Sequence, residues 1–216
     1  MRKNKIFFFF LVLIVLSACS NSKTEYWDNG NKMSEIEYSG KKQNGKARWW
    51  FANGKLQMEA NYKNGKLEGS FMRWYINGQQ EVLSHYKDDK LNGLKTEWNE
   101  FGIKLSEKIY LNDSLDGKAK QWYPNANLML ESAYKNGKYD GEWISYNERS
   151  FVISKAKFNN GNGIMESYDI RGNKVLESNF ENNLKHGKEI VFDDKGEIIK
   201  VRYYDKNQLI KEEEIK

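Results

Sequence analysis

Aromatic side chains recur along this chain at intervals of twelve residues, with polar and small residues between them. The series runs without a gap to Phe158, and after one step of ten residues it continues to the C-terminal region. Its members are Tyr26, Tyr38, Trp50, Tyr62, Trp74, Tyr86, Trp98, Tyr110, Trp122, Tyr134, Tyr146, Phe158, Tyr168, Phe180, Phe192 and Tyr204. Regularity of this kind indicates a repeat array rather than a globular domain.

Glycines repeat with twice that period. One series is Gly45, Gly69, Gly93, Gly117, Gly141, Gly163 and Gly187, evenly spaced except for the shorter step to Gly163. A second series follows at a constant offset, at Gly54, Gly78, Gly102, Gly172 and Gly196, with Gly30 upstream and with Ala126 and Ser150 as its exceptions. Each repeat unit therefore holds two rings and two turns.

Twelve residues with one ring and one turn suit a strand of about six residues and a connection. The dipeptides that tolerate positive φ are Asn53-Gly54, Asn64-Gly65, Asn77-Gly78 and Asn136-Gly137, and Asp89, Asp113, Asn183 and Asn207 fill the slot of Gly65. We therefore predict an all-β, elongated array of antiparallel β-hairpins, with about 16 short strands in a twisted or curled single sheet. The tail Lys211 to Glu214 is predicted to be a charged terminal strand that discourages edge pairing.

One ring per strand at a fixed phase predicts a ladder of rings side by side across the sheet. Small residues two positions before a ring should leave room on the same face; these are Ala60, Ser84, Ser132, Ala156 and Ser178. The fifth repeat lacks its second turn glycine, and its exit turn is two residues short. We therefore predict a kink or a change in twist between about Tyr146 and Gly163.

The N-terminal residues have the pattern of a secretion signal. Arg2, Lys3 and Lys5 precede an apolar run of eleven residues, which is too short to span a bilayer as a mature helix. The sequence Leu-Ser-Ala-Cys that ends at Cys19 resembles the bacterial lipobox, in which the cysteine is lipidated. The alternative is an ordinary signal peptide with a stray cysteine. We expect a signal peptide at 1–18, a short linker at 19–25 and the repeat domain at 26–216.

Charge and residue types exclude several functions. Without the signal peptide the formal net charge falls from +5 to +2, because Arg2, Lys3 and Lys5 are removed and no acidic residue precedes Cys19; nucleic-acid binding is therefore not predicted. His85 and His186 lie about four repeats apart, and the chain has a single cysteine. We predict no enzyme, no metal site and no cofactor.

Neighbouring pairs of aromatic residues place one ring on each face of a strand, although the ladder needs only one. We interpret the additional rings as a candidate binding surface for a protein or a glycan. The alternative is packing beneath a curled sheet. The candidate residues are Trp49, Phe51, Tyr75, Tyr123 and Tyr203.

The combination G-x-x-x-x-W-Y-x-N-G with E-x-x-Y-K-N-G-K-L-x-G is clearest from Gly45 to Gly93 and from Gly117 to Gly141. It resembles the MORN-repeat variant of bacterial proteins in the YwqK-type antitoxin group. The motif glutamate, three residues before the tyrosine, is present at Glu35, Glu59, Glu107, Glu131 and Glu177, and is replaced at Leu83, Lys155 and Val201.

This resemblance covers Tyr26 to Tyr204 and implies binding without catalysis. With the lipobox it suggests an interaction scaffold that is anchored to a bacterial membrane through lipid on Cys19 and has an unknown protein partner. Ser20 rather than aspartate follows the cysteine, which favours the outer membrane or cell surface over the inner membrane. The alternatives are an antitoxin or immunity protein that neutralises a toxin and, more weakly, a glycan-binding protein.

Overall fold

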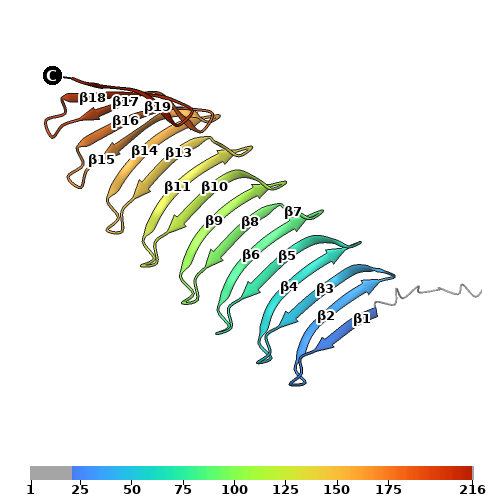
Figure 1. Ribbon diagram of the computed structural model, residues 1–216. Coiled ribbons are helices and arrows are strands. Elements are labelled where there is room, and N and C mark those ends of the chain that lie inside the picture. The colour runs from blue at the N-terminus through green and yellow to red at the C-terminus, as the bar shows by residue number, and fades with distance from the viewer. Residues whose placement is uncertain (1–20, 216) are drawn as a thin grey trace, which may run out of the picture.

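The computed structural model describes residues 21–215, which form one elongated, antiparallel sheet of 19 strands (Figure 1). Each strand pairs with its neighbours in sequence, from β1 with β2 to β18 with β19. The predicted all-β hairpin array is confirmed. Among the described residues, no helix has the length and apolar character needed to cross a membrane.

The strands are β1 (Asn21–Tyr26), β2 (Lys32–Ser39), β3 (Lys42–Trp50), β4 (Leu56–Lys63), β5 (Lys66–Trp74), β6 (Gln80–Lys87), β7 (Lys90–Leu91), β8 (Gly93–Trp98), β9 (Lys104–Leu111), β10 (Ser114–Trp122), β11 (Leu128–Lys135), β12 (Lys138–Tyr139), β13 (Gly141–Tyr146), β14 (Val152–Asn159), β15 (Asn162–Tyr168), β16 (Lys174–Glu181), β17 (Leu184–Phe192), β18 (Ile198–Asp205) and β19 (Gln208–Glu214). One residue separates β7 from β8 and β12 from β13, and each pair occupies one strand position. The described sheet thus has the sixteen predicted positions and β19, which contains the charged tail.

Two kinds of turn form the two long rims of the sheet. On one rim, two-residue turns such as Asn64-Gly65 have φ of 54° and 85°, and Asp88-Asp89 has 50° and 68°. Two successive positive φ angles define the type I′ hairpin turn, and they confirm the predicted positive φ at these positions. Backbone bonds join neighbouring turns on this rim, for example from the amide of Asp89 to the carbonyl of Leu67, 3.0 Å away.

The other rim, called here the loop rim, consists of five-residue connections. They are residues 27–31, 51–55, 75–79, 99–103, 123–127, 147–151, 169–173 and 193–197. The fourth residue of a connection has positive φ, 81° at Gly54 and 67° at Ala126. Ala126 and Ser150 therefore keep the glycine conformation, at a cost of about 1–2 kcal/mol each.

The rings do not form the predicted single ladder. Trp50 is the last residue of β3, whereas Tyr62 is next to last in β4, and these two strands run in opposite directions. A step of twelve residues therefore carries each ring to the opposite rim. Tyr62 lies opposite Gly45 and Trp50 lies opposite Leu56. Two separate rows, each with one ring per repeat unit, replace the ladder.

The small residues share a face with the tyrosine row, as predicted. Ala60 and Tyr62 alternate with residues of the other face, and Ala60 lies opposite Ala47 and Phe71. Ala60, Ser84, Ser132 and Ser178 are buried, while Ala156 is half-buried. We call this side of the sheet the tyrosine face. Its surrounding rings cover the small side chains, although the sheet has no second layer.

Ser84 provides a test of packing on the tyrosine face. Its side chain is 1% exposed, and its hydroxyl oxygen has no hydrogen-bond partner within residues 21–215. A buried hydroxyl without a partner costs about 1–3 kcal/mol, and alanine fits the equivalent position at Ala60. We expect Ser84→Ala to raise the midpoint of urea unfolding by the equivalent of about 1 kcal/mol. Ser178→Ala is the control: its hydroxyl bonds to Glu189, so this variant should lose stability.

The fifth repeat, which is two residues short before Gly163 and is called here the short repeat, lacks a bulge that the other repeats have. In a full repeat Leu67 pairs with Tyr62 and Phe71 with Ala60, so that Glu68 and Gly69 are extra residues on β5. Between β14 and β15 the pairing continues without a shift, and Gly163 lies directly opposite Phe158. Figure 1 shows strands β15 to β19 turned relative to the earlier strands, in agreement with the predicted kink.

Aromatic rings gather where the bulge is lost. Phe158 lies 5.1 Å from Tyr139, 6.2 Å from Trp143 and 5.6 Å from Phe180, measured between ring centroids. With 3% of its surface exposed, Phe158 is the most buried ring among the described residues. On the rim, Asn183 Oδ1 accepts a hydrogen bond from the amide of Tyr139, 2.8 Å away. The short repeat thus carries a cluster of packed aromatic rings.

Candidate binding face

The face opposite the tyrosine face carries a continuous row of residues, one from each strand position. The row is Thr24, Glu35, Arg48, Glu59, Met72, Leu83, Thr96, Glu107, Lys120, Glu131, Ile144, Lys155, Glu166, Glu177, Ile190, Val201 and Glu213. Adjacent members lie directly opposite one another, so their side chains are neighbours. We call this side the ionic face.

The motif glutamates belong to this row, and each pairs with a base. Glu107 and Glu177 pair with Lys104 and Lys174 of their own strands, whereas Glu59 and Glu131 pair with bases on neighbouring strands. Arg48 Nε lies 2.7 Å from Glu59 Oε2, and Lys120 Nζ lies 2.6 Å from Glu131 Oε1. Burial raises the pKa of Glu59, but hydrogen bonds from Arg48 and Lys46 outweigh it and hold that pKa below its ordinary value. The glutamates are therefore charges paired on the surface of the sheet, either across strands or within one strand.

At two of the three places where the motif glutamate is missing, its replacement and the residue opposite it are both apolar. Leu83 lies opposite Met72, and Val201 lies opposite Ile190. An apolar pair replaces an ion pair at both places, which avoids a charge without a partner. The departures from the motif thus follow the pairing of the sheet.

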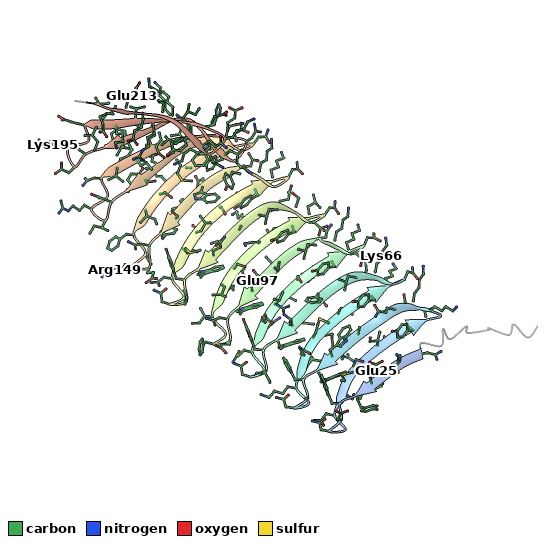
Figure 2. All side chains as sticks on the ribbon, in the orientation of Figure 1. Glu25, Lys66, Glu97, Arg149, Lys195 and Glu213 are labelled. Atoms are coloured by element: carbon green, nitrogen blue, oxygen red, sulfur yellow. The ribbon has the colours of Figure 1, made fainter. Side chains whose placement is uncertain are left out.

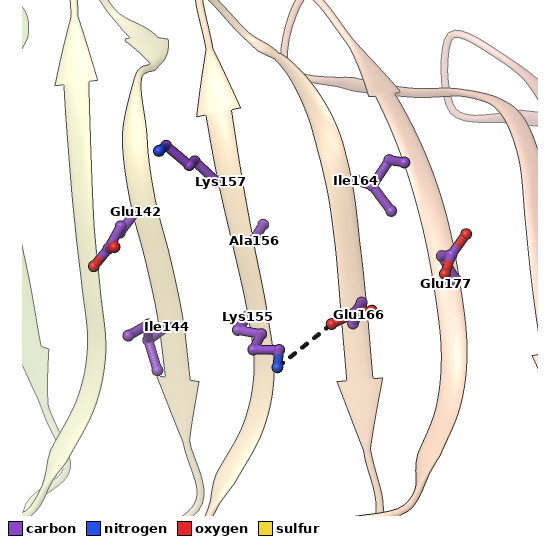
Figure 3. A pocket seen from close by; sticks show the side chains of 8 residues that line it. All are labelled: Glu142, Ile144, Lys155, Ala156, Lys157, Ile164, Glu166 and Glu177. Atoms are coloured by element: carbon purple, nitrogen blue, oxygen red, sulfur yellow. Dashed lines mark ion pairs between the residues drawn. The ribbon is translucent and has the colours of Figure 1, made fainter.

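Two hollows lie side by side on the ionic face. One has a volume of about 420 Å³ and is lined by Glu142, Ile144, Lys155, Ala156, Lys157, Ile164, Glu166 and Glu177 (Figure 3). The other, of about 290 Å³, is lined by Lys118, Ala119, Lys120, Glu131, Ser132, Ala133 and Glu142. Because Glu142 borders both, the two hollows are adjacent, and the surface that they cover from β10 to β16 is called here the ionic-face groove.

Most charges in the groove are paired. Lys155 Nζ lies 3.6 Å from Glu166 Oε2, the pair drawn in Figure 3. Glu166 and Glu177 lie opposite each other, and Lys174 contacts both, at 3.6 and 2.8 Å. A hydrogen bond from the hydroxyl of Tyr168 is the main reason that the pKa of Glu166 lies below its ordinary value. This part of the groove stays charged at neutral pH.

Glu142 and Lys157 differ from these pairs. They lie directly opposite each other on β13 and β14, yet within residues 21–215 neither forms an ion pair. Ile164 is the next residue in their row and is exposed. One acid, one base and an apolar side chain are therefore available in the groove to a binding partner.

The five candidate rings are not brought together. Phe51, Tyr75 and Tyr123 lie in the loop rim, while Trp49 is on the tyrosine face opposite Ser34. Tyr203 is on the ionic face, where its hydroxyl donates to Glu213 at 3.3 Å. All five side chains are half-buried. A shared surface formed by these five is not what the structure provides, and a binding role for each alone stays a prediction.

The two loop-rim tyrosines link neighbouring repeats. The hydroxyl of Tyr75 donates to the carbonyl of Trp98 at 3.0 Å, and that of Tyr123 donates to the carbonyl of Tyr146 at 2.8 Å. Trp27 does the same through Nε1 to the carbonyl of Trp50. A ring at the first residue of a connection thus holds it to the next repeat. Where the ring is replaced, Asn99 caps its own connection by accepting from the amide of Ile103.

The groove residues Ile144, Lys157 and Ile164 were missed by sequence reasoning. No pattern in the sequence distinguishes the two isoleucines, because apolar residues also stand at the equivalent positions of other repeats, as at Met72 and Ile190 for Ile144 and at Leu94 for Ile164. Within residues 21–215 no group of three or more His, Cys, Asp or Glu side chains is arranged to hold a metal ion. Cys19 and the expected signal peptide lie outside the described residues.

Two segments of the chain match a known family. No curated protein matches the chain. The matched segments, residues 43–64 and 115–136, each begin in one strand, β3 or β10, and continue through a five-residue connection to the strand that follows. Their surroundings are hairpins of the same geometry. The chain thus contains two copies of the MORN repeat variant, which supports a repeat-based binding module.

Proposed function

We propose that this protein is a non-catalytic scaffold that binds another protein on the ionic face, with the ionic-face groove at the centre of the contact. The observation that carries the proposal is the groove itself, which covers two adjacent hollows across six strand positions. It offers Glu142 and Lys157, which form no ion pair in the described part of the chain, and the exposed side chain of Ile164. The support from the fold is that residues 21–215 form an open sheet with an extended groove, and such a surface suits a protein partner.

A paired substitution tests this site. Ile164→Asp places a charge in the groove, and Leu94→Asp is the matched control at the equivalent repeat position, outside the groove and also exposed. We expect the full wild-type chain and Leu94→Asp to retain one stoichiometric protein from membrane extracts. The amount of this protein retained by Ile164→Asp should be at least tenfold lower. Equal retention by all three chains would place the binding elsewhere.

We further propose that the chain is anchored in the cell envelope by lipid on Cys19. The support is the lipobox sequence after an apolar run, and the absence of any other cysteine that could pair with it. Growth with labelled palmitate should label the full chain and not Cys19→Ala, and only the wild type should sediment with membranes. Label that persists in Cys19→Ala would contradict the anchor.

The identity of the captured protein separates the remaining functions. A secreted toxin that loses activity when bound would favour an immunity or antitoxin-like role. Should no protein be retained, a panel of cell-wall polysaccharides tests glycan binding, for which the rings of Tyr75 and Tyr203 are the first candidates. Capture of an inactivated toxin, or binding of a polysaccharide, would replace the scaffold as the leading function.

A further inference from the structure

The connections of the loop rim are of two kinds, which differ in their first residue. Those that begin with a ring start at Trp27, Phe51, Tyr75 and Tyr123, and those that begin with a polar residue start at Asn99, Asn147, Asp169 and Asp193. Each polar side chain accepts a hydrogen bond from the amide of the fifth residue of its own connection, as Asn147 does from Phe151 at 3.1 Å. It therefore caps its own connection and gives no ring to the next repeat.

The connection 123–127 shows what a ring and an asparagine provide. Tyr123 donates to the carbonyl of Tyr146, and Asn125 Nδ2 donates to the carbonyl of Glu148 at 3.2 Å. Both acceptors belong to the next repeat. The first and third residues of a connection thus bond to its neighbour along the rim.

The following connection, 147–151, lacks both groups. Asn147 stands in place of the ring, and Arg149 stands in place of the asparagine. The equivalent acceptors in the next repeat are the carbonyls of Tyr168 and Ile170, and no side chain within residues 21–215 donates to either. One position for a ring is therefore empty beside the connection 169–173.

A hollow lies at this position on the rim. It has a volume of about 540 Å³ and is lined by Tyr123, Asn147, Glu148, Arg149, Phe151 and Ile170. Pockets that bind ligands usually have about 300–1,000 Å³. Its apolar walls are open to solvent, since Phe151 is 53% exposed and Ile170 is 78% exposed. Exposed apolar groups that gather at a hollow mark an interaction site.

Two charges beside the hollow indicate what kind of molecule enters it. Glu148 and Arg149 are exposed, and neither forms an ion pair in the part of the chain that the structure describes. Figure 2 shows Arg149 at the outer margin of the loop rim. A wholly apolar ligand would cover Phe151 and Ile170 but give these charges no partner. The residues that flank a ring in a protein can pair with them.

We propose that the hollow receives a tyrosine or tryptophan side chain of a partner protein. The ring covers Phe151 and Ile170, and its O–H or N–H donates to the carbonyl of Tyr168. The chain's own rings do the same through Nε1 of Trp27 and the hydroxyl of Tyr75. Rings with a polar edge are frequent anchors of protein contacts. This contact is separate from the ionic-face groove, because the two share no lining residue.

Titration with N-acetyltyrosinamide tests the site in the full chain. We expect this probe to shift the amide NMR signals of Arg149, Phe151 and Ile170, with a dissociation constant in the millimolar range. N-acetylphenylalaninamide lacks the hydroxyl and should bind about fivefold more weakly. N-acetylleucinamide has no ring and should bind at least tenfold more weakly. Equal binding of the tyrosine and leucine probes, or shifts confined to other residues, would overturn the proposal.

A double variant tests whether the ring occupies this position. Asn147→Tyr with Arg149→Asn gives the connection the pattern of 123–127, so that the chain fills the hollow with its own ring. The probe should bind at least tenfold more weakly, and the midpoint of urea unfolding should rise. Unchanged affinity for the probe in this variant would contradict the proposal.

The matched control makes the same exchange in another connection that begins with asparagine. Asn99→Tyr with Phe101→Asn should leave the affinity for the probe unchanged; an equal loss in this control would show that the effect does not depend on the hollow. Ile164→Asp, the variant that tests the groove, should also bind the probe as the wild type does. Failure of the groove and failure of this site are therefore separate results.

Discussion

Replacing Phe158 with alanine is expected to lower the free energy of unfolding by about 3–5 kcal/mol, the usual cost of a buried phenylalanine. The ring is 3% exposed and contacts Tyr139, Trp143 and Phe180. A sheet without a second layer has no other side chains that could move into the space. Urea unfolding followed by tryptophan fluorescence measures the loss, since Trp143 lies in the same cluster.

Tyr110→Ala is the matched control for this prediction. Tyr110 has the same place in the tyrosine row and lies opposite Gly93, but it is half-buried. We expect it to lose about half as much stability. If the two variants lose equal amounts, the cluster at the short repeat has no special role in stability.

Removing the carboxylate of Glu189 is expected to cost about 3 kcal/mol. The residue is 2% exposed, and it accepts hydrogen bonds from Ser178 at 2.9 Å, from Arg202 at 3.2 Å and from Lys185. Glu189→Ala leaves two cations without their shared anion, and breaking a buried pair typically costs about 3–5 kcal/mol. We place the loss at the lower limit because the cations reach solvent. Urea unfolding at pH 7 measures it.

The same carboxylate gives a pH dependence with a defined sign. Burial alone raises the pKa of Glu189, but the bonds from Lys185, Ser178 and Arg202 outweigh it, so that the pKa lies below its ordinary value. The unfolded chain therefore binds this proton first, and stability is complete above about pH 4.3 and lost as the pH falls towards the lowered pKa.

Glu189→Gln should show a weaker loss of stability between pH 5 and pH 3 than the wild type. Glu197→Gln is the control for this measurement. Glu197 is exposed and forms no ion pair in the described part of the chain, so its variant should follow the wild-type curve. Identical pH curves for all three chains would show that Glu189 titrates as an ordinary carboxylate.

The local rules of the fold could be read from the sequence. The period of twelve, the Asn-Gly dipeptides and the small residues before the rings predict the strands, the turns with positive φ and the buried positions such as Ala60. These features depend on residues near one another in the chain. The loss of two residues before Gly163 likewise predicted the place where the sheet turns.

The arrangement of the rings could not be read in the same way. A period of twelve does not reveal that Trp50 ends its strand at one rim and Tyr62 at the other, because that depends on the exact register of β3 and β4. The candidate groove was missed for a related reason. Glu142, Lys157 and Ile164 come from three strands, and only the pairing of those strands makes them neighbours.

The pairing of every strand with its neighbours in sequence has a consequence for how the chain folds. Adjacent turns on a rim belong to successive repeats, and the bond from Tyr139 to Asn183, which reaches one repeat further, still spans only 44 residues. Contacts this local have a small loop-closure cost and favour rapid folding. As the chain is synthesised, each new strand meets an edge that already exists, so the sheet can grow one strand at a time in the order of translation.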